Sequence, residues 1–502
     1  MSVEQEELIK QIQEWSEEKE YHKIAATIEM LPEEERMPEL TSLLADACEH
    51  LAESADAPDA ASYLKRAFTL LDSVEDDLKE DGDWNYRMGY ACYHLGREGE
   101  ALPCFEKSVE LRPGDEDAKS YVEKCKRALM NPTHIISFRR RTKAAWKSFL
   151  NGEAELRRMI SLQVPSETIV EKCSEMLAPA FSDVAFELGR NGEKYDLILS
   201  PEGNRAKLFQ LLYFRQQAPE TVLEHWNILL GRQQTDPEQC AFEMFGQSIS
   251  AQDVRVWPAR KEDVISVALY CETLLPLLRE DADKAWWMLA VMLDQVLGEV
   301  ASMRYVEGFE VLNAPLDEAG LTLDQLPAYL KTELAPEEEN LNDAEHYCTL
   351  CSGYEMQPDQ GESAGVRTDI YAGVTACAQL LNDFYQGEDQ LMNRFHADGV
   401  VPGFLEYPLD GFSGEDRGEQ VLNFRDTLEK AILEKAGAEA VTFIGGASGV
   451  YDGYLDFIAW DLEAVLNAAV EVLEEMPVRW TGFHVFRRGI EGMLLKDVTE
   501  NQ

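Results

Sequence analysis

The chain has 502 residues, of which 45% are hydrophobic, and a formal net charge of −48. The length predicts roughly two to four domains, because one hydrophobic core does not organise so long a chain, and the hydrophobic fraction predicts that they fold. The charge excludes general binding to nucleic acid and to anionic membranes, since both need positive protein surface.

The cysteines and the apolar stretches predict a reduced, cytoplasmic protein. The 10 cysteines are scattered, and several, such as Cys92, Cys125 and Cys271, lie in apolar helical contexts that indicate buried thiols rather than disulfides. The first residues, MSVEQEELIKQ, are charged and do not resemble a secretion signal. Apolar runs at 268–278 and 286–300 are interrupted by acidic residues before they reach membrane-spanning length. The acidic surface has two explanations that stay open, general solubility and a basic protein partner.

Residues 1–130 are predicted to be wholly helical, because apolar residues recur at spacings of three and four. The predicted helices are 3–18, 21–31, 37–53, 59–74, 84–96, 99–111 and 115–129. Asp115, which follows Pro113-Gly114, is the expected N-cap of the last helix. That helix is expected to seal the end of a stacked helical array.

The segment from Trp84 to Pro113 carries the most specific pattern in the chain. Gly89, Ala101, Phe105 and Pro113 fall where a tetratricopeptide repeat has its small, small, aromatic and terminating residues. Asn85 and Cys92 depart from that pattern. The segment nevertheless resembles a tetratricopeptide repeat, which implies closely packed helix pairs and binding to a protein or peptide.

Three tyrosines on the first helix of this pair are candidate partner-binding residues. Tyr86, Tyr90 and Tyr93 are spaced by four and three. The resemblance implies that they face the concave groove of the array, where a tyrosine offers an apolar face and a hydrogen-bonding tip. The alternative is that they pack on the neighbouring helical hairpin. The Lys and Asn residues of the carboxylate-clamp type of repeat are missing from this face, so a chaperone-tail receptor is not expected.

Residues 131–178 are predicted to form basic connecting helices. Their cations are Arg139, Arg140, Arg141, Lys143, Lys147, Arg157 and Arg158. In so acidic a chain we favour internal docking of this segment on acidic faces of the flanking domains, over a partner site or nucleic-acid binding.

Two α+β domains are predicted beyond it, at 179–335 and 343–498, joined by the acidic run at 336–342. In the first, strands are predicted at 184–188, 195–199, 225–230, 241–249, 253–257, 263–271 and 309–312, and helices at 205–217, 281–303 and 322–333. In the second, strands are predicted at 347–356, 366–371, 403–407 and 479–487, with a hairpin across 440–460, and helices at 373–395, 418–436 and 462–476. Both domains contain a hairpin, helix and strand in that order, which suggests that they are related. They resemble α+β modules attached to such arrays in uncharacterised bacterial cytoplasmic proteins, which is an analogy of fold alone.

Possible metal and phosphate sites are each weaker than a structural explanation. His346, Cys348 and Cys351 could begin a zinc or redox site, but no second ligand pair follows, and an alternating strand would point the cysteines to opposite faces. The glycines of 445–449 could cradle phosphate, but a strand rather than a helix is predicted after them, so they are interpreted as a hairpin turn. We assign no metal site and no cofactor.

A catalytic site is likewise not assigned. Asp452, Asp456 and His484 could meet if their strands were neighbours, and a carboxylate that orients a histidine is one arrangement of a general base. No nucleophile is fixed nearby.

The sequence thus predicts a tetratricopeptide-like array followed by two α+β domains. The predicted function is non-catalytic protein–protein interaction, as an adaptor or as an acidic immunity-type inhibitor of a basic toxin. The alternative is a hydrolase-like enzyme with its site in the last domain, for which His484 and Asp456 are the candidates.

Overall fold

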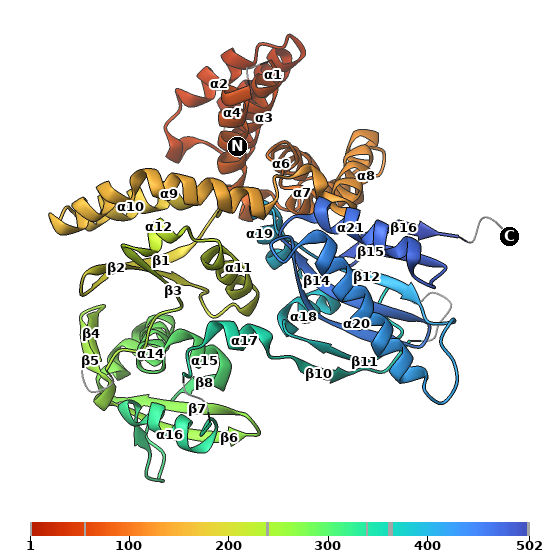
Figure 1. Ribbon diagram of the computed structural model, residues 1–502. Helices are drawn as coiled ribbons and strands as arrows, with labels where there is room; N and C mark the ends of the chain where they lie inside the picture. Colours follow the sequence, from red (N-terminus) through yellow and green to blue (C-terminus); the bar gives the residue numbers. More distant parts are fainter. Residues whose placement is uncertain (1–2, 55–56, 237–239, 338–339, 360–364, 499–502) are drawn as a thin grey trace. The chain divides into compact units, whose positions relative to one another are not determined.

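The computed structural model describes residues 3–54, 57–236, 240–337, 340–359 and 365–498. The chain forms two compact units. The first contains residues 1–137, 383–443 and 450–502, and the second contains residues 138–382 and 444–449. Helices come first along the chain and sheets follow, as predicted (Figure 1). No helix of the described residues is both long enough and apolar enough to cross a membrane.

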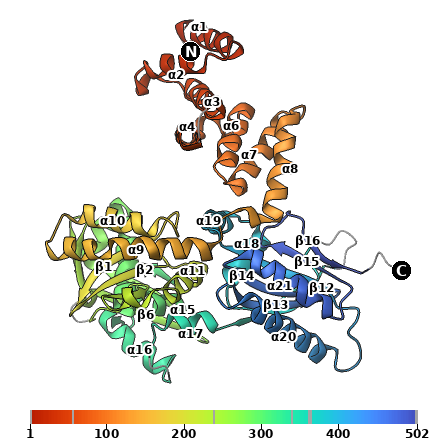
Figure 2. The ribbon, with the colours of Figure 1, turned by 45° about the horizontal axis from the view of Figure 1, so that its top comes forward.

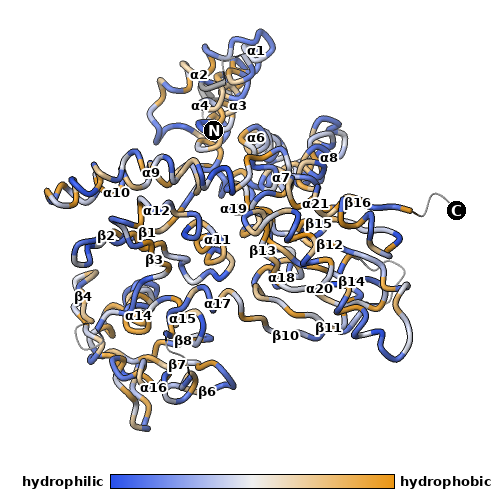
Figure 3. Tube along the Cα trace, in the orientation of Figure 1, coloured by the Kyte–Doolittle hydropathy of each residue, from blue (hydrophilic) through white to orange (hydrophobic). Residues whose placement is uncertain are grey.

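The N-terminal part of the first unit is helical. Its elements are α1 (Val3–Glu17), α2 (Tyr21–Glu29), η1 (Glu33–Glu35), α3 (Pro38–Ser54), α4 (Ala57–Asp72), α5 (Glu75–Leu78), α6 (Gly82–His94), α7 (Glu98–Leu111), α8 (Glu116–Met130) and η2 (Pro132–His134). Asp115 caps α8 as predicted, since its carboxylate accepts a hydrogen bond of 2.9 Å from the Ala118 amide. Along these helices hydrophobic and hydrophilic residues alternate (Figure 3), and the hydrophobic ones form one shared core.

Helices α6 and α7 approach closely at the small residues that the sequence singled out. Ala101 and Phe105 are fully buried, and a Cβ added to Gly89 would lie 3.0 Å from the Phe105 ring. Only a residue without a side chain leaves room for that ring. The packing reason inferred from the sequence for this glycine is therefore confirmed.

The rest of the first unit is an antiparallel sheet covered on one face by helices. Its elements are α19 (Gln390–Asp398), β12 (Val401–Pro408), α20 (Arg417–Ala436), β14 (Asp452–Ala459), α21 (Leu462–Glu475), β15 (Trp480–Val485) and β16 (Met493–Asp497). Strand β12 pairs with β14 on one side and with β15 on the other. Leu405, Phe457 and Phe483 share a core with Leu428 of α20 and Leu466 of α21, and the two helices lie along the sheet (Figure 2).

Helix α8 belongs to both parts of this unit. Cys125 lies in the core of the N-terminal helices, whereas Leu129, one turn later, lies in the core of the sheet. The array and the sheet of the first unit are therefore continuous through one helix.

The second unit contains smaller sheets. Its elements are α9 (Phe138–Ser161), α10 (Ser166–Leu177), β1 (Ala185–Asn191), β2 (Lys194–Ser200), α11 (Arg205–Gln216), α12 (Glu220–Leu223), β3 (Trp226–Leu230), β4 (Ala241–Met244), β5 (Gln247–Ser250), η3 (Ala251–Asp253), β6 (Val254–Lys261), β7 (Val264–Cys271), η4 (Glu272–Leu274), α13 (Leu275–Glu280), α14 (Ala282–Leu297), α15 (Glu299–Tyr305), β8 (Val306–Val311), β9 (Leu321–Thr322), η5 (Leu323–Gln325), α16 (Leu326–Glu333), α17 (Ala344–Thr349), β10 (Ser352–Glu355) and β11 (Ile370–Thr375). Helix α18 (Ala378–Gln386) and strand β13 (Val441–Gly449) each belong partly to both units. The sheet orders are β1-β2-β3 and β8-β7-β6-β9, with β4-β5 as a separate pair.

Aromatic rings of the basic segment pack within the second unit. On α9, Trp146 stacks on Phe214 with the ring centroids 4.3 Å apart, and Phe149 meets Trp226 at 5.3 Å. The arginines of its last turns pair along the same helix, Arg157 with Glu153 at 2.6 Å and Arg158 with Glu155 at 2.9 Å. Arg157 and Arg158, two of the cations singled out from the sequence, therefore form ion pairs within their own helix.

Glycines break two helices that the sequence predicted as continuous. The predicted helix 281–303 is α14 and α15, separated by Gly298 with φ at 84°. The predicted helix 373–395 is α18 and α19, and Gly387 between them has φ at 76°. Positive φ ends a right-handed helix, and glycine adopts it at little cost.

The predicted strand 347–356 is also wrong in its first half. Residues 344–349 form helix α17, whose N-cap Asp343 accepts a hydrogen bond of 3.0 Å from the His346 amide. Only 352–355 form a strand, β10. The alternating apolar pattern suggested a strand, but the N-cap at Asp343 starts a short helix instead.

The two hairpin–helix–strand blocks differ in strand pairing. In the first block β3 pairs directly with β2 and runs parallel to it. In the second block β12 lies between β14 and β15. The shared order along the chain therefore does not correspond to a shared sheet topology. The sequence predicted four segments of the chain as separate domains. Whether each of them folds independently is a matter for experiment, so this division stays a prediction.

Replacing Gly89 by Val should destabilise the helical part by about 1–3 kcal/mol, because the new methyl groups overpack the Phe105 ring. Gly114→Ala is the matched control, since nothing lies within 4 Å of the position that its Cβ would take. Denaturant unfolding followed by far-ultraviolet circular dichroism measures both. Equal midpoints for the two variants would contradict the packing account.

Candidate functional site

Helix α3 carries a polar stripe along the side that faces α6. The stripe consists of Glu39, Ser42, Asp46, Glu49 and Glu53, which are spaced by three and four and so share one helical face. Helix α6 presents Asp83, Arg87, Tyr90 and His94 at the same kind of spacing. We call these two stripes together the α3–α6 surface.

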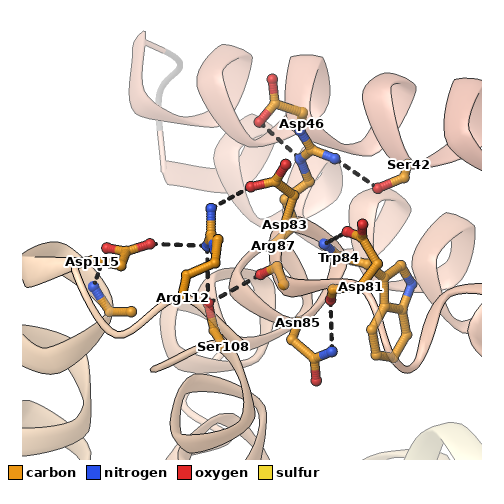
Figure 4. A network of polar contacts seen from close by, with 12 residues as sticks. Ser42, Asp46, Asp81, Asp83, Trp84, Asn85, Arg87, Ser108, Arg112 and Asp115 are labelled. Carbon is orange, nitrogen blue, oxygen red and sulfur yellow. Dashed lines mark hydrogen bonds and ion pairs between the residues drawn. The ribbon is translucent and has the colours of Figure 1, made fainter. Parts of the chain in front are cut away.

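Two side chains of α6 cross to α3. The Arg87 guanidinium donates to Asp46 Oδ1 at 3.1 Å and to Ser42 Oγ at 2.8 Å (Figure 4). One turn further, the Tyr90 hydroxyl donates to Glu53 Oε1 at 2.9 Å. These bonds fix the two stripes against each other.

A buried carboxyl lies between these two crossings. Glu49 is only 5% exposed, and its Oε1 has no hydrogen-bond partner among the described residues. Burial is the main cause that raises the pKa of Glu49 well above its ordinary value, and the charge of Asp46 adds to it, while Arg87 acts in the opposite direction. A carboxyl held in this way favours its neutral form or a neighbouring cation.

A pocket of about 430 Å³ opens beside Arg87. Its charged lining residues are Glu17, Glu39, Asp46, Asp81, Asp83 and Arg87. Carboxylates thus outnumber the single arginine of the lining, and the pocket has an acidic character.

A second network shown in Figure 4 links the beginning of α6 to the end of α7. Arg112 pairs with Asp83 and, at 2.9 Å, with Asp115. Ser108 donates to the Gly82 carbonyl at 3.0 Å. The beginning of α6 is therefore held by the end of α7, which keeps the stripe of α6 in place.

Of the three tyrosines predicted to bind a partner, Tyr90 belongs to this surface, and all three are half-buried. Each contacts Tyr121 of α8, with ring centroids 6.2 Å away from Tyr86, 5.8 Å from Tyr90 and 5.2 Å from Tyr93. Packing on the neighbouring helix, the alternative weighed from the sequence, is thus present, and Tyr90 in addition bonds to the acidic stripe. Burial is the largest cause that raises the pKa of Tyr86 and Tyr90, so both hydroxyls stay protonated and can donate.

The cysteine segment does not form a metal cluster among the described residues. Cys348 is buried and Cys351 is exposed, and both are free thiols. Burial raises the pKa of Cys348 to about 12, which disfavours the thiolate that a metal requires. The described residues that do bring ligand atoms together are Glu98, His134 and His396.

The candidates in the last third are rearranged relative to the sequence prediction. The glycines of 445–449 lie inside strand β13, paired with β11, and not in a turn. Strands β14 and β15 are not neighbours, and Asp456 and His484 both lie opposite Phe404 of the strand between them. His484 instead pairs with Glu406 at 2.9 Å, and its ring stacks on Phe404. The sequence predicted that His484 would meet Asp456. Its carboxylate partner is Glu406, which the sequence analysis did not single out.

Comparison of the chain with protein-family models, curated proteins and solved structures found no match.

The acidic stripe was also missed from the sequence, although its signal was available. The spacing of residues 39, 42, 46, 49 and 53 gives a polar face on a helix most of whose other positions are apolar. That this face is opposed by α6, and that Glu49 is buried by it, follows only from the packing of the helices.

Glu49→Gln should stabilise the chain at neutral pH by about 1–3 kcal/mol, because glutamine keeps the shape and cannot ionise. The pKa of Glu49 is raised in the folded state, so the folded chain holds this proton more tightly than the unfolded chain does. Stability from this group is therefore present in acid and is lost as the pH rises from about 4.3, the ordinary pKa of glutamate, through the folded value.

Denaturant unfolding of both proteins at acid and neutral pH measures this difference. Glu34→Gln, at an exposed position, is the control and should leave the pH dependence unchanged. A Glu49→Gln variant whose stability falls with pH as steeply as that of the unsubstituted chain would contradict the account.

Proposed function

We propose that this chain is a non-catalytic interaction protein that holds a basic segment of a partner protein on the α3–α6 surface. The resemblance of residues 84–113 to a tetratricopeptide repeat supports this proposal, because that fold presents one face of its helices to a peptide. One form of this function is an acidic immunity-type protein that covers a cationic toxin or enzyme.

The observation that carries the proposal is the excess of carboxyl groups that face Arg87. Asp46 forms an ion pair with Arg87, with an N–O distance of 3.1 Å. Buried Glu49, in contrast, has a carboxyl oxygen with no hydrogen-bond partner among the described residues. An incoming lysine or arginine would supply the positive charge that these groups lack, and a desolvated, charge-assisted bond is stronger than one in water.

The tyrosine cluster supports the same type of partner. Lys124 of α8 already lies over the Tyr121 ring, with Nζ 4.0 Å from the centroid. The faces of Tyr90 and Tyr93 belong to the same cluster and stay half-exposed. Rings in this position attract cations through their π-electrons, and their hydroxyls bond to peptide groups.

The size of the pocket also suits a side chain rather than a folded surface. Its volume, about 430 Å³, falls in the range of small-ligand pockets, roughly 300–1,000 Å³. A long basic side chain can enter it, while the rest of the partner segment lies across the tyrosines. Such binding predicts steep salt dependence, because the attraction is between charges at a partly exposed surface.

The double substitution Asp46→Asn with Glu53→Gln should weaken binding of lysine- and arginine-rich peptides at least tenfold and make it less dependent on salt. The peptides are selected on an array against the full chain, and affinities are then measured by calorimetry at two salt concentrations. Glu34→Gln changes the net charge at an exposed position outside the surface and should bind as the unsubstituted chain does.

Equal affinity of the double variant and the control variant would overturn the proposal. Circular dichroism of the double variant separates a loss of binding from a loss of fold, because Asp46 and Glu53 each contribute one hydrogen bond to α6.

A further inference from the structure

Outside the α3–α6 surface, Glu98, His134 and His396 converge from distant parts of the first unit. Glu98 is the first residue of α7, His134 ends η2, and His396 lies in α19. Their nearest side-chain ligand atoms all lie within 4.8 Å of one another. Among the described residues no other group of this kind is found.

We infer that Glu98, His134 and His396 form a binding site for one divalent transition-metal ion of the zinc class. Two imidazole nitrogens and one carboxylate are the donor set that Zn²⁺ takes where a further position is left for water. This inference does not depend on the proposed binding of a basic partner.

The distances suit such an ion. The Nε2 atoms of His396 and His134 lie 2.9 Å and 3.2 Å from the two carboxylate oxygens of Glu98. An ion about 2.0–2.1 Å from each ligand in a tetrahedral arrangement holds the ligand atoms about 3.3 Å apart. All the ligand atoms lie within 4.8 Å of one another, so a bound ion would draw the two imidazole rings closer together.

Two of the three ligands are buried and one is accessible to solvent. The side chains of Glu98 and His396 are 8% and 9% exposed, whereas that of His134 is 47% exposed. The two buried ligands are held by the fold, and the exposed ring provides an entry path and can turn toward the ion. The same exposure leaves room for a water ligand in the fourth position.

The charge of Arg487 would oppose a metal ion, and part of it is offset by an ion pair. Arg487 is buried, and its guanidinium pairs with Asp389 at 3.2 Å and donates to Asn393 Oδ1 at 2.8 Å. Asp389 therefore offsets much of this charge, while the Glu98 carboxylate stays in direct contact with the two imidazoles.

The test is a calorimetric titration of the full chain with Zn²⁺ after removal of metal by a chelator. The inference predicts one Zn²⁺ per chain, a rise in the unfolding temperature on binding, and at least tenfold weaker binding for His134→Ala. Because His134 is exposed, this variant should keep the fold, and Glu98→Gln serves as a second variant that keeps the shape of the side chain.

The matched control is the double variant His346→Ala with Cys351→Ser, which removes two of the three zinc ligands considered from the sequence. It should bind Zn²⁺ as the unsubstituted chain does. The inference is overturned if the full chain takes up no Zn²⁺, if His134→Ala and Glu98→Gln bind it unchanged, or if only the control variant loses it.

Discussion

The packing of α3 against α6 brings a row of carboxyl groups to a shared boundary, and Arg87 crosses it to Asp46 and Ser42. Without that crossing, Asp46 and buried Glu49 would repel one another in a medium that screens charge poorly. Arg87 therefore makes the acidic stripe compatible with a folded helical array. Arg87 neutralises only part of the negative charge of the stripe. The proposed partner would bind to the carboxylates that remain unpaired with a cation.

Helix α6 serves the fold and the candidate site with different faces. On one face Gly89 admits the Phe105 ring of α7, and on another Arg87 and Tyr90 reach α3. Helix α8 then connects this array to the sheet of the same unit, with Cys125 in one core and Leu129 in the other. The close α6–α7 contact helps to hold the polar groups of α6 in position, and such preorganisation would lower the entropy cost of the proposed binding.

The sequence predicted most helices because their apolar residues repeat with the helical period, and it predicted the cap at Asp115 from its position alone. The breaks at Gly298 and Gly387 were missed, since a single glycine inside an apolar pattern does not reveal its φ. The candidate sites depend still more on tertiary structure. Tyr90 was found from a resemblance, whereas the burial of Glu49 and the meeting of Glu98, His134 and His396 arise from helices that are distant along the chain.

The central claim is that Glu49 lies in a surface that receives a cation, and proton release on binding tests it most directly. A basic group bound beside Glu49 must lower the raised pKa of that carboxyl, so the chain should release a proton when a lysine-rich peptide binds. Calorimetric titration in buffers of different ionisation enthalpy, between about pH 5 and 8, measures the number of protons released. The account predicts release by the unsubstituted chain and its loss in Glu49→Gln. Binding with no proton release, or with the same release in both proteins, would contradict it.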